Sequence, residues 1–307
     1  MILPYPAEDL ATATWIDLLQ PTSDEVERVR TLTRLRVPTE TQISEIESTS
    51  RLAFENGAFY VSTPLVGRIE GDDHTLTPVG FVLSSRILLT VRFASLPSFD
   101  EAHKTCEASK PRSAEEAFLH ILEAIVDRAA DKLESAGAEC DEVSRNTFRP
   151  VPGTSASGPL RETLQRVGLA ANRISLVRDG LLGVGRIGAY IMDSGFEGAP
   201  KVNSARLQAI RTDVTSLMEY EQHLSNKVQF LLDATLGFIN IEQNDIVKTL
   251  TIASVVGIPP VLIAGIYGMN FHFMPELGWR YGYVYALLLI VVSALLPLLW
   301  FKWRRWM

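Results

Sequence analysis

The longest hydrophobic pattern in the chain is a 3-4 repeat that begins at Leu207 and ends at Phe238. Eight of its ten positions are apolar, and about four and a half heptads follow without a slip. No Pro or Gly occurs until Gly237, and no turn signal follows Ile239. We therefore predict one continuous helix from about Asn203 into the next apolar segment. The repeat comprises Leu207, Ile210, Val214, Leu217, Glu221, Leu224, Val228, Leu231, Thr235 and Phe238.

The opposite face of this helix is polar but carries only two charges. It comprises Thr212, Thr215, Glu219, Gln222, Asn226, Gln229, Asp233, Asn240 and Asn244. One interpretation is the solvated back of a coiled coil, although such a face usually alternates Lys and Glu. The other interpretation is a water-lined conduit, which we favour. Its continuation is largely apolar, as expected for a constriction that closes by dewetting: Val247, Leu250, Thr251, Ser254, Ile258 and Val261.

Two uncharged apolar runs, residues 250–267 and 283–301, lie close together near the C-terminus. Each is long enough to cross a hydrocarbon core of about 30 Å, so they predict a transmembrane hairpin. Basic residues flank the hairpin on one side, which predicts an inner or plasma membrane location with both termini cytoplasmic. The flanking residues are Lys248, Lys302, Arg304 and Arg305, with Trp300, Trp303 and Trp306 as interfacial anchors.

A hairpin of two helices cannot enclose a water-filled path, because each helix exposes a face to lipid. A pore would therefore require a homo-oligomer. Within the first run, Pro259 and Pro260 remove the helical donors for the carbonyls of Val255 and Val256. At membrane depth such carbonyls are tolerated against protein or a wet cavity. They could form a carbonyl site or simply accompany a packing kink.

The residues before the stalk read as an α/β domain followed by long helices. Short strands rich in β-branched and aromatic residues are predicted at 15–18, 51–55, 58–63, 78–83 and 87–92. Helices are predicted at 23–31, 39–47, 98–108, 114–148 and 159–193. We expect an α/β cytosolic domain at 1–110, a helical layer at 111–200, a stalk helix at 201–248, transmembrane helices at 249–267 and 283–301 with an outer loop at 268–282 between them, and a basic tail at 302–307.

Charge and composition exclude several functions. The first 248 residues hold 25 basic and 35 acidic side chains, which disfavours nucleic-acid binding and attracts cations. The glycine pattern of residues 183–188 lies inside a helical repeat, so it does not indicate dinucleotide binding. The two cysteines, Cys106 and Cys140, match no metal-ligand spacing. No phosphate-binding loop and no nucleophile–base arrangement occurs, so we expect neither an enzyme nor an organic cofactor.

The end of the first apolar run carries the sequence Gly268-Met269-Asn270, followed by Met-Pro-Glu-Leu at 274–277. This resembles the CorA family of magnesium transporters, whose signature is Gly-Met-Asn between two C-terminal spans. The resemblance continues back through 244–248 and 231–233 and weakens before residue 110. It implies a homopentameric funnel in the lipid bilayer, with the first span lining the pore. The missing phosphate-binding loop separately argues against an ATP drive.

The resemblance also implies where divalent cations bind. Asn270 side chains and Gly268 carbonyls would form a selectivity ring with Met269, and such neutral oxygens suit a hydrated Mg²⁺ ion. Glu276 would attract cations to the mouth. Asp233 matches a stalk aspartate of the family that resembles part of a regulatory Mg²⁺ site. Loss of Mg²⁺ from that site would open the pore. The sequence offers four candidates for the acid that would bind Mg²⁺ together with Asp233: Asp72, Asp73, Asp100 and Glu101.

Two positions depart from the family pattern. His272 occupies a position where an acid is frequent, and Val261 stands where many members have a polar Thr. The leading hypothesis is a passive, potential-driven Mg²⁺ channel gated by cytosolic Mg²⁺. The first alternative is a Zn²⁺, Co²⁺ or Ni²⁺ transporter of the same superfamily, in which His272 would help bind a borderline ion. The second is a membrane-tethered sensor domain without ion flux.

Overall fold

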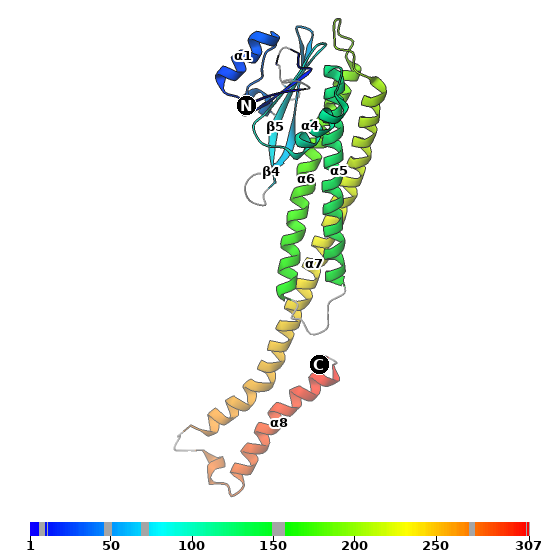
Figure 1. Ribbon diagram of the computed structural model, residues 1–307. Helices are drawn as coiled ribbons and strands as arrows, with labels where there is room; N and C mark the ends of the chain where they lie inside the picture. The colour runs from blue at the N-terminus through cyan, green and yellow to red at the C-terminus, as the bar shows by residue number, and fades with distance from the viewer. Residues whose placement is uncertain are drawn as a thin grey trace. The chain divides into compact units, whose positions relative to one another are not determined.

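The computed structural model describes residues 1–5, 10, 12–45, 51–68, 74–148, 157–269, 274–304 and 306 (Figure 1). The chain divides into two compact units. The first comprises Met1–Val151 and Thr163–Leu232, and the second comprises Pro152–Glu162 and Asp233–Met307. The predicted linker near Pro150 lies outside the described residues.

The first unit contains a six-stranded sheet whose strand order is β1-β2-β6-β5-β4-β3. All neighbouring strands are antiparallel except β2 and β6, which pair in parallel. The five predicted strands are confirmed, and β1 is an addition. The edge position of β1 explains how it accommodates Pro4, which lacks a backbone donor. The strands are β1 (Ile2–Tyr5), β2 (Trp15–Leu19), β3 (Leu52–Glu55), β4 (Ala58–Arg68), β5 (His74–Ser84) and β6 (Leu88–Arg92).

The hairpin between β3 and β4 shows how local sequence determines register. Glu55 pairs with Ala58, which leaves a loop of two residues, Asn56 and Gly57. Both loop residues have positive φ, 50° and 77°. Asn-Gly is the favoured pair for this type of turn, because it tolerates the left-handed conformation twice and matches the strand twist.

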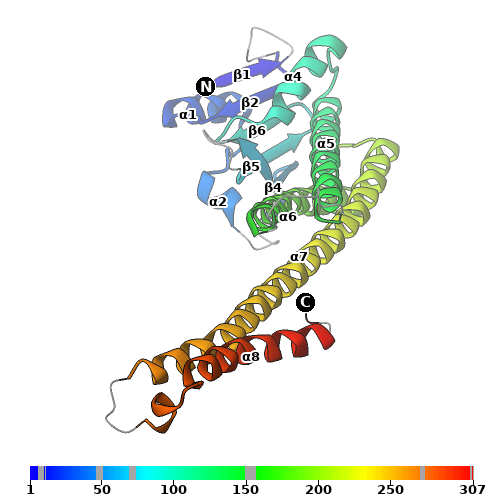
Figure 2. The ribbon, with the colours of Figure 1, turned by 90° about the horizontal axis from the view of Figure 1, so that it is seen from below.

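Side chains alternate between the two faces of the sheet, and each face is covered by helices (Figure 2). Trp15 and Phe81 belong to the larger hydrophobic cluster, which includes residues of α4, α5, α6 and α7. Ile16 and Val82 belong to a smaller cluster with Val29 of α1. The predicted α/β fold class is therefore confirmed. The helices are α1 (Ser23–Thr33), α2 (Glu40–Ser44), α4 (Pro97–Ser109), α5 (Ala114–Phe148), α6 (Ser157–Asp193) and α7 (Ser204–Tyr267).

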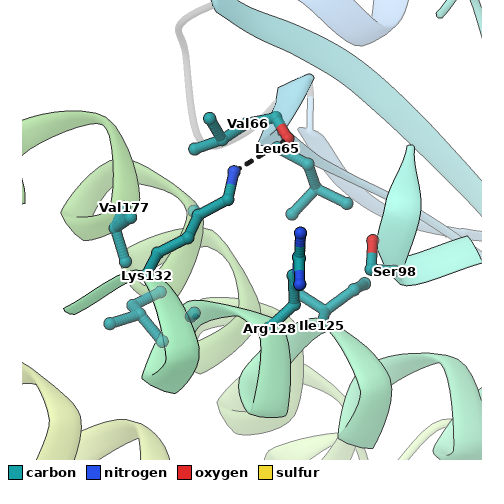
Figure 3. A pocket seen from close by; sticks show the side chains of 10 residues that line it. Leu65, Val66, Ser98, Ile125, Arg128, Lys132 and Val177 are labelled. Atoms are coloured by element: carbon teal, nitrogen blue, oxygen red, sulfur yellow. Dashed lines mark hydrogen bonds between the residues drawn. The ribbon is translucent and has the colours of Figure 1, made fainter. Parts of the chain in front are cut away.

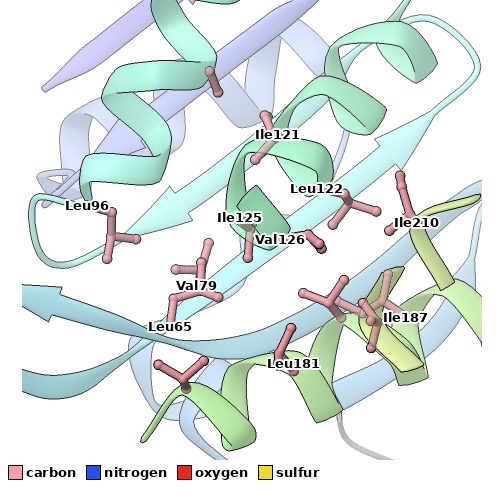
Figure 4. Packing of buried hydrophobic residues seen from close by; sticks show 14 of the residues in the cluster. Leu65, Val79, Leu96, Ile121, Leu122, Ile125, Val126, Leu181, Ile187 and Ile210 are labelled. Atoms are coloured by element: carbon pink, nitrogen blue, oxygen red, sulfur yellow. The ribbon is translucent and has the colours of Figure 1, made fainter. Parts of the chain in front are cut away.

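Apolar side chains from the sheet and from three long helices meet in the centre of the larger cluster (Figure 4). Ile121 and Ile125 of α5 face the sheet together with Leu181 of α6, and Ile210 of α7 closes the same core. The glycine pattern predicted not to bind dinucleotides lies inside α6. Gly183 is a packing position there, because a Cβ atom would lie 1.8 Å from the Thr63 hydroxyl oxygen of β4.

The second unit contains the end of α7, a 3-10 turn η1 (Pro275–Gly278) and α8 (Gly282–Trp303). The chain reverses after α7, so α8 runs in the opposite direction (Figure 1). Both α7 and α8 include a window long and apolar enough to cross a membrane, and almost none of either window is buried in the single chain. The continuous helix predicted from about Asn203 is confirmed.

Candidate functional site

The candidate site lies along α7, whose 3-4 repeat is buried down to Thr235 except at Leu217, which is partly buried. Leu207, Leu224 and Leu231 are buried, whereas Phe238 is exposed. The polar member Glu221 is also buried, and the structure satisfies it. Its carboxylate accepts a hydrogen bond from Ser225 Oγ at 2.8 Å and lies 3.5 Å from the Arg178 guanidinium of α6. The seam therefore packs against helices of the same chain.

The opposite, polar face of α7 is solvent-exposed along its length. Every member from Thr212 to Asn244 is exposed in the single chain. Some polar groups bond within the helix: Gln222 Nε2 donates to Asn226 Oδ1 at 3.2 Å, and Thr215 Oγ1 donates to the Arg211 carbonyl at 2.9 Å. The face presents mainly amide and hydroxyl oxygens, so it can carry water and hydrated cations without binding them tightly.

The predicted pore-lining residues continue along α7 within the second unit. Val247, Leu250, Ile258 and Val261 are all more than 60% exposed, and Val261 reaches 73%. Thr251 is exposed and donates its hydroxyl to the Val247 carbonyl at 2.8 Å. That bond uses the hydroxyl proton, so the Thr251 oxygen remains an acceptor for a cation or a water molecule. Ser254 is partly buried.

Two adjacent prolines, Pro259 and Pro260, lie inside α7 without ending it. Because proline has no N–H group, the carbonyls four residues earlier, at Val255 and Val256, lack their usual helical donors. Val255 is exposed in the single chain and Val256 is partly buried. The helix therefore offers backbone oxygen acceptors in the middle of its apolar section.

The helix α7 ends at Tyr267, directly before the Gly-Met-Asn sequence. The Gly268 amide donates to the carbonyls of Ala264 and Gly265, at 3.0 and 3.2 Å, and the Met269 amide donates to Ile266 at 3.2 Å. A Cβ atom at Gly268 would lie 3.2 Å from the Ala264 carbonyl oxygen, so glycine allows this tight closure. Asn270 and His272 lie outside the described residues.

The outer loop continues through η1, in which Glu276 is the second residue. The ring centroids of Trp279 and Tyr285 are 5.8 Å apart, and the Gly282 amide donates to the Trp279 carbonyl at 2.9 Å. These contacts tie the loop to the start of α8. They place the Glu276 backbone between the two apolar helices, as the sequence predicts.

The acids predicted to bind regulatory Mg²⁺ do not all lie on α7. Asp233 is exposed on α7, and Asp72 and Asp73 lie outside the described residues. Asp100 and Glu101 begin α4 and line a groove of about 450 Å³ between α4 and α5. Among the described residues, no group of three or more acidic, His or Cys side chains is close enough to hold a metal ion.

The same groove contains three acids of α5 that the sequence reasoning did not select: Glu123, Asp127 and Asp131. Their spacing of four residues on a predicted helix was the available signal. Burial raises the pKa of Asp127, and the carboxylates of Glu123, Asp131 and Asp213 raise it further. Arg206 and Arg128 pair with two of these acids, at 2.7 Å to Glu123 and 3.6 Å to Asp131. Arginines thus balance two of the three acids, and the nearby carboxylates act mainly on Asp127.

A small pocket beside this groove carries the opposite charge (Figure 3). Lys132 of α5 extends toward the Val66 carbonyl at 3.4 Å, and Arg128 and Ser98 border the same space. Burial lowers the pKa of Lys132 to about 8, and Arg128 lowers it as well. The volume is about 40 Å³, which suits water rather than a larger ligand.

Comparisons with known proteins give one family along nearly the whole chain. A family model described as CorA-like Mg2+ transporter protein matches residues 11–304. The magnesium transport protein CorA of Yersinia pseudotuberculosis is 30% identical over 304 residues, covering 98% of this chain and 94% of the relative. Its Escherichia coli K12 counterpart is 29% identical with the same coverage. The CorA magnesium transporter of Methanocaldococcus jannaschii has a similar structure, with a TM-score of 0.75 at 20% identity over 99% of this chain and 95% of that one.

Proposed function

The chain belongs to the CorA-like Mg²⁺ transporter family, and on this premise we propose that it is a passive Mg²⁺ channel that assembles as a homopentamer. Five α7 helices would surround one axis with their polar faces inward. The observation that carries this proposal is the exposed, nearly uncharged polar face of α7, which leads into exposed apolar positions. That sequence of surfaces suits a hydrated conduit followed by a constriction that closes by dewetting.

Selection would occur where α7 ends. Rings of Gly268 carbonyls and Asn270 amides, with Met269 between them, would hold the ion through its water shell, because Mg²⁺ loses water reluctantly. The tight closure at Gly268 supports this role, since it turns the chain directly at the helix end. Glu276 would raise the local cation concentration at the mouth. The pore below would be lined by Asn244, Val247, Leu250, Thr251, Ser254, Ile258 and Val261.

Gating would depend on cytosolic Mg²⁺ bound at Asp233 between neighbouring protomers. The acidic groove between α4 and α5 supports a regulatory role for the first unit, because its negative charge would raise the local concentration of cations. The chain would lie in the inner membrane with both termini on the cytoplasmic side. Influx needs no ATP, since moving two charges inward across −100 mV releases about 4.6 kcal/mol.

The test is Mg²⁺ influx into liposomes that contain the full-length protein and a Mg²⁺-sensitive dye. We expect influx that increases with inside-negative potential and that falls at least about tenfold in Asn270→Ala, because the ring loses its amide oxygens. The matched control is Asn146→Ala, an exposed asparagine of α5. Unchanged influx in Asn270→Ala would refute the filter assignment. Preferential uptake of Zn²⁺ in competition would favour the borderline-ion alternative.

A further inference from the structure

A third cavity, of about 180 Å³, lies within the first unit, on the face of the sheet opposite to the Lys132 pocket. It opens beside α2 and is bordered by Arg36, Gln42, Arg51, Tyr60 and Ser62. It is several times larger than the Lys132 pocket and can hold a small molecule rather than one water. The ion path proposed above does not use it.

Strand pairing explains why a cavity forms here. Ser62 of β4 pairs with Gly80 of β5, so both positions face α2. A Cβ atom at Gly80 would lie 2.9 Å from Ile43 Cγ2, which shows that α2 rests directly on the glycine. The helix is only five residues long and packs on Gly80, whereas the neighbouring Ser62 borders the cavity.

Ser62 is the most informative side chain in this cavity. Only 6% of the residue is exposed, and no described residue provides a hydrogen-bond partner for its Oγ atom. Buried hydroxyl groups are nearly always hydrogen-bonded, and an unpaired one destabilises the fold. The cavity that Ser62 faces has mixed walls, with apolar residues such as Ile43 and Phe81 beside the polar side chains of Arg36, Gln42 and Arg51. A polar group bound there would satisfy the hydroxyl.

Two arginines identify the charge of that ligand. Arg36 lies over the Tyr60 ring at 4.9 Å and pairs with Glu55 at 3.5 Å, where both side chains are close to half exposed. Arg51 donates its Nε–H to the Glu45 carbonyl. A guanidinium carries five N–H donors in a planar fork that matches an oxyanion, and the described contacts use only part of this capacity. Glu45 also lines the cavity and Glu55 pairs with Arg36, so two carboxylates balance the two arginines until a ligand displaces the exposed Arg36–Glu55 pair.

We propose that this cavity binds the phosphate group of a small metabolite, with Arg36 and Arg51 as the charged donors and Ser62 as the buried donor. The exposed Arg36–Glu55 pair is weak enough to yield to a phosphate group. The ligand is an anion and the site lies outside α7, so the proposal is independent of the Mg²⁺ pathway. Free phosphate and a phosphate monoester share the chemistry that these residues recognise.

The test is isothermal titration calorimetry on the full-length protein in detergent, at constant ionic strength in chloride. One arm uses inorganic phosphate and the other uses glycerol 3-phosphate. We expect saturable binding in at least one arm, and the stronger arm identifies the source. Arg51→Gln should weaken binding at least about tenfold, as expected for the loss of a charge-assisted hydrogen bond. The control Arg28→Gln changes the same charge on α1, outside the cavity, and should bind like the original protein.

A second variant separates binding from folding. Ser62→Ala removes the unpaired hydroxyl, so it should raise the melting temperature without phosphate and weaken phosphate binding. The absence of saturable binding in both arms would overturn the proposal. Equal affinity in Arg51→Gln and Arg28→Gln would also overturn it. Neither measurement uses Mg²⁺ transport, so failure of the phosphate-site proposal can be distinguished from failure of the channel assignment.

Discussion

Asp17 shows how a buried charge is stabilised inside the sheet of the first unit. Its carboxylate accepts hydrogen bonds from Arg92 Nη2 at 2.9 Å and from Thr90 Oγ1 at 2.7 Å, and His103 Nε2 lies 3.3 Å away. Burial alone would raise the pKa of Asp17, but these partners outweigh it and hold the pKa below its usual value. The group links β2, β6 and α4.

Replacing this carboxylate should destabilise the protein strongly. Asp17→Asn leaves the buried Arg92 without a counter-charge, which we expect to lower the free energy of unfolding by about 3–5 kcal/mol. The measurement is chemical denaturation of the full chain in detergent. Glu27→Gln, which breaks the exposed pair with Arg30, is the control and should cost less than about 1 kcal/mol. Equal effects of the two variants would contradict this role.

The same carboxylate should contribute to acid sensitivity. Because its folded-state pKa is lowered, its stabilisation is fully present above the unfolded-state value of about 4 and is lost as pH falls through the folded-state pKa. Unfolding free energies measured between pH 6 and pH 3 should therefore fall less steeply in Asp17→Asn than in the original protein.

Lys132 should make the free energy of unfolding depend on pH at alkaline rather than acidic pH. Its pKa falls from 10.5 to about 8 on folding, because burial disfavours the ammonium ion. The unfolded chain therefore binds more protons between about pH 8 and pH 10.5, and stability should rise across that interval. In Lys132→Met this rise should disappear, and stability at pH 7 should increase. An unchanged pH profile in the variant, measured by denaturation, would refute the assignment.

Helix α6 shows how glycines determine packing between elements. Gly183 faces Thr63 so closely that even a methyl group collides with it, whereas a Cβ atom at Gly168 meets nothing within 4 Å. We expect Gly183→Ala to destabilise the fold by about 1–3 kcal/mol through overpacking. Gly168→Ala, in the same helix, should stabilise it by about 0.5–1 kcal/mol, since alanine favours the helix. Thermal unfolding of both variants checks the prediction, and effects of the same sign would contradict it.

Two surfaces of the molecule are exposed in the single chain: the polar face of α7 and the apolar windows of α7 and α8. Lipid can cover the apolar windows, and in the proposed channel water and further copies of the chain would cover the nearly uncharged polar face. We expect native mass spectrometry in detergent to give five times the 34.0 kDa chain mass. A monomer or dimer would instead favour the membrane-tethered sensor.

The sequence by itself determined the features that depend on local periodicity. The 3-4 repeat predicts the course of α7, uncharged runs of sufficient length predict the apolar helices, and alternating β-branched residues predict five of the six strands. The order of exposed polar and apolar positions along α7 follows from the same repeat. The candidate site lies on that one helix and at its end, so sequence reasoning could propose it.

Only the tertiary structure decided which distant residues meet. The parallel pairing of β2 with β6 brings Asp17 to Thr90 and Arg92, and the packing of α4 on α5 gathers the acidic groove. The placement of α2 on Gly80 leaves Ser62 beneath a cavity. No short-range pattern encodes these contacts, because strand order and helix packing are set by burial of surface across the whole unit.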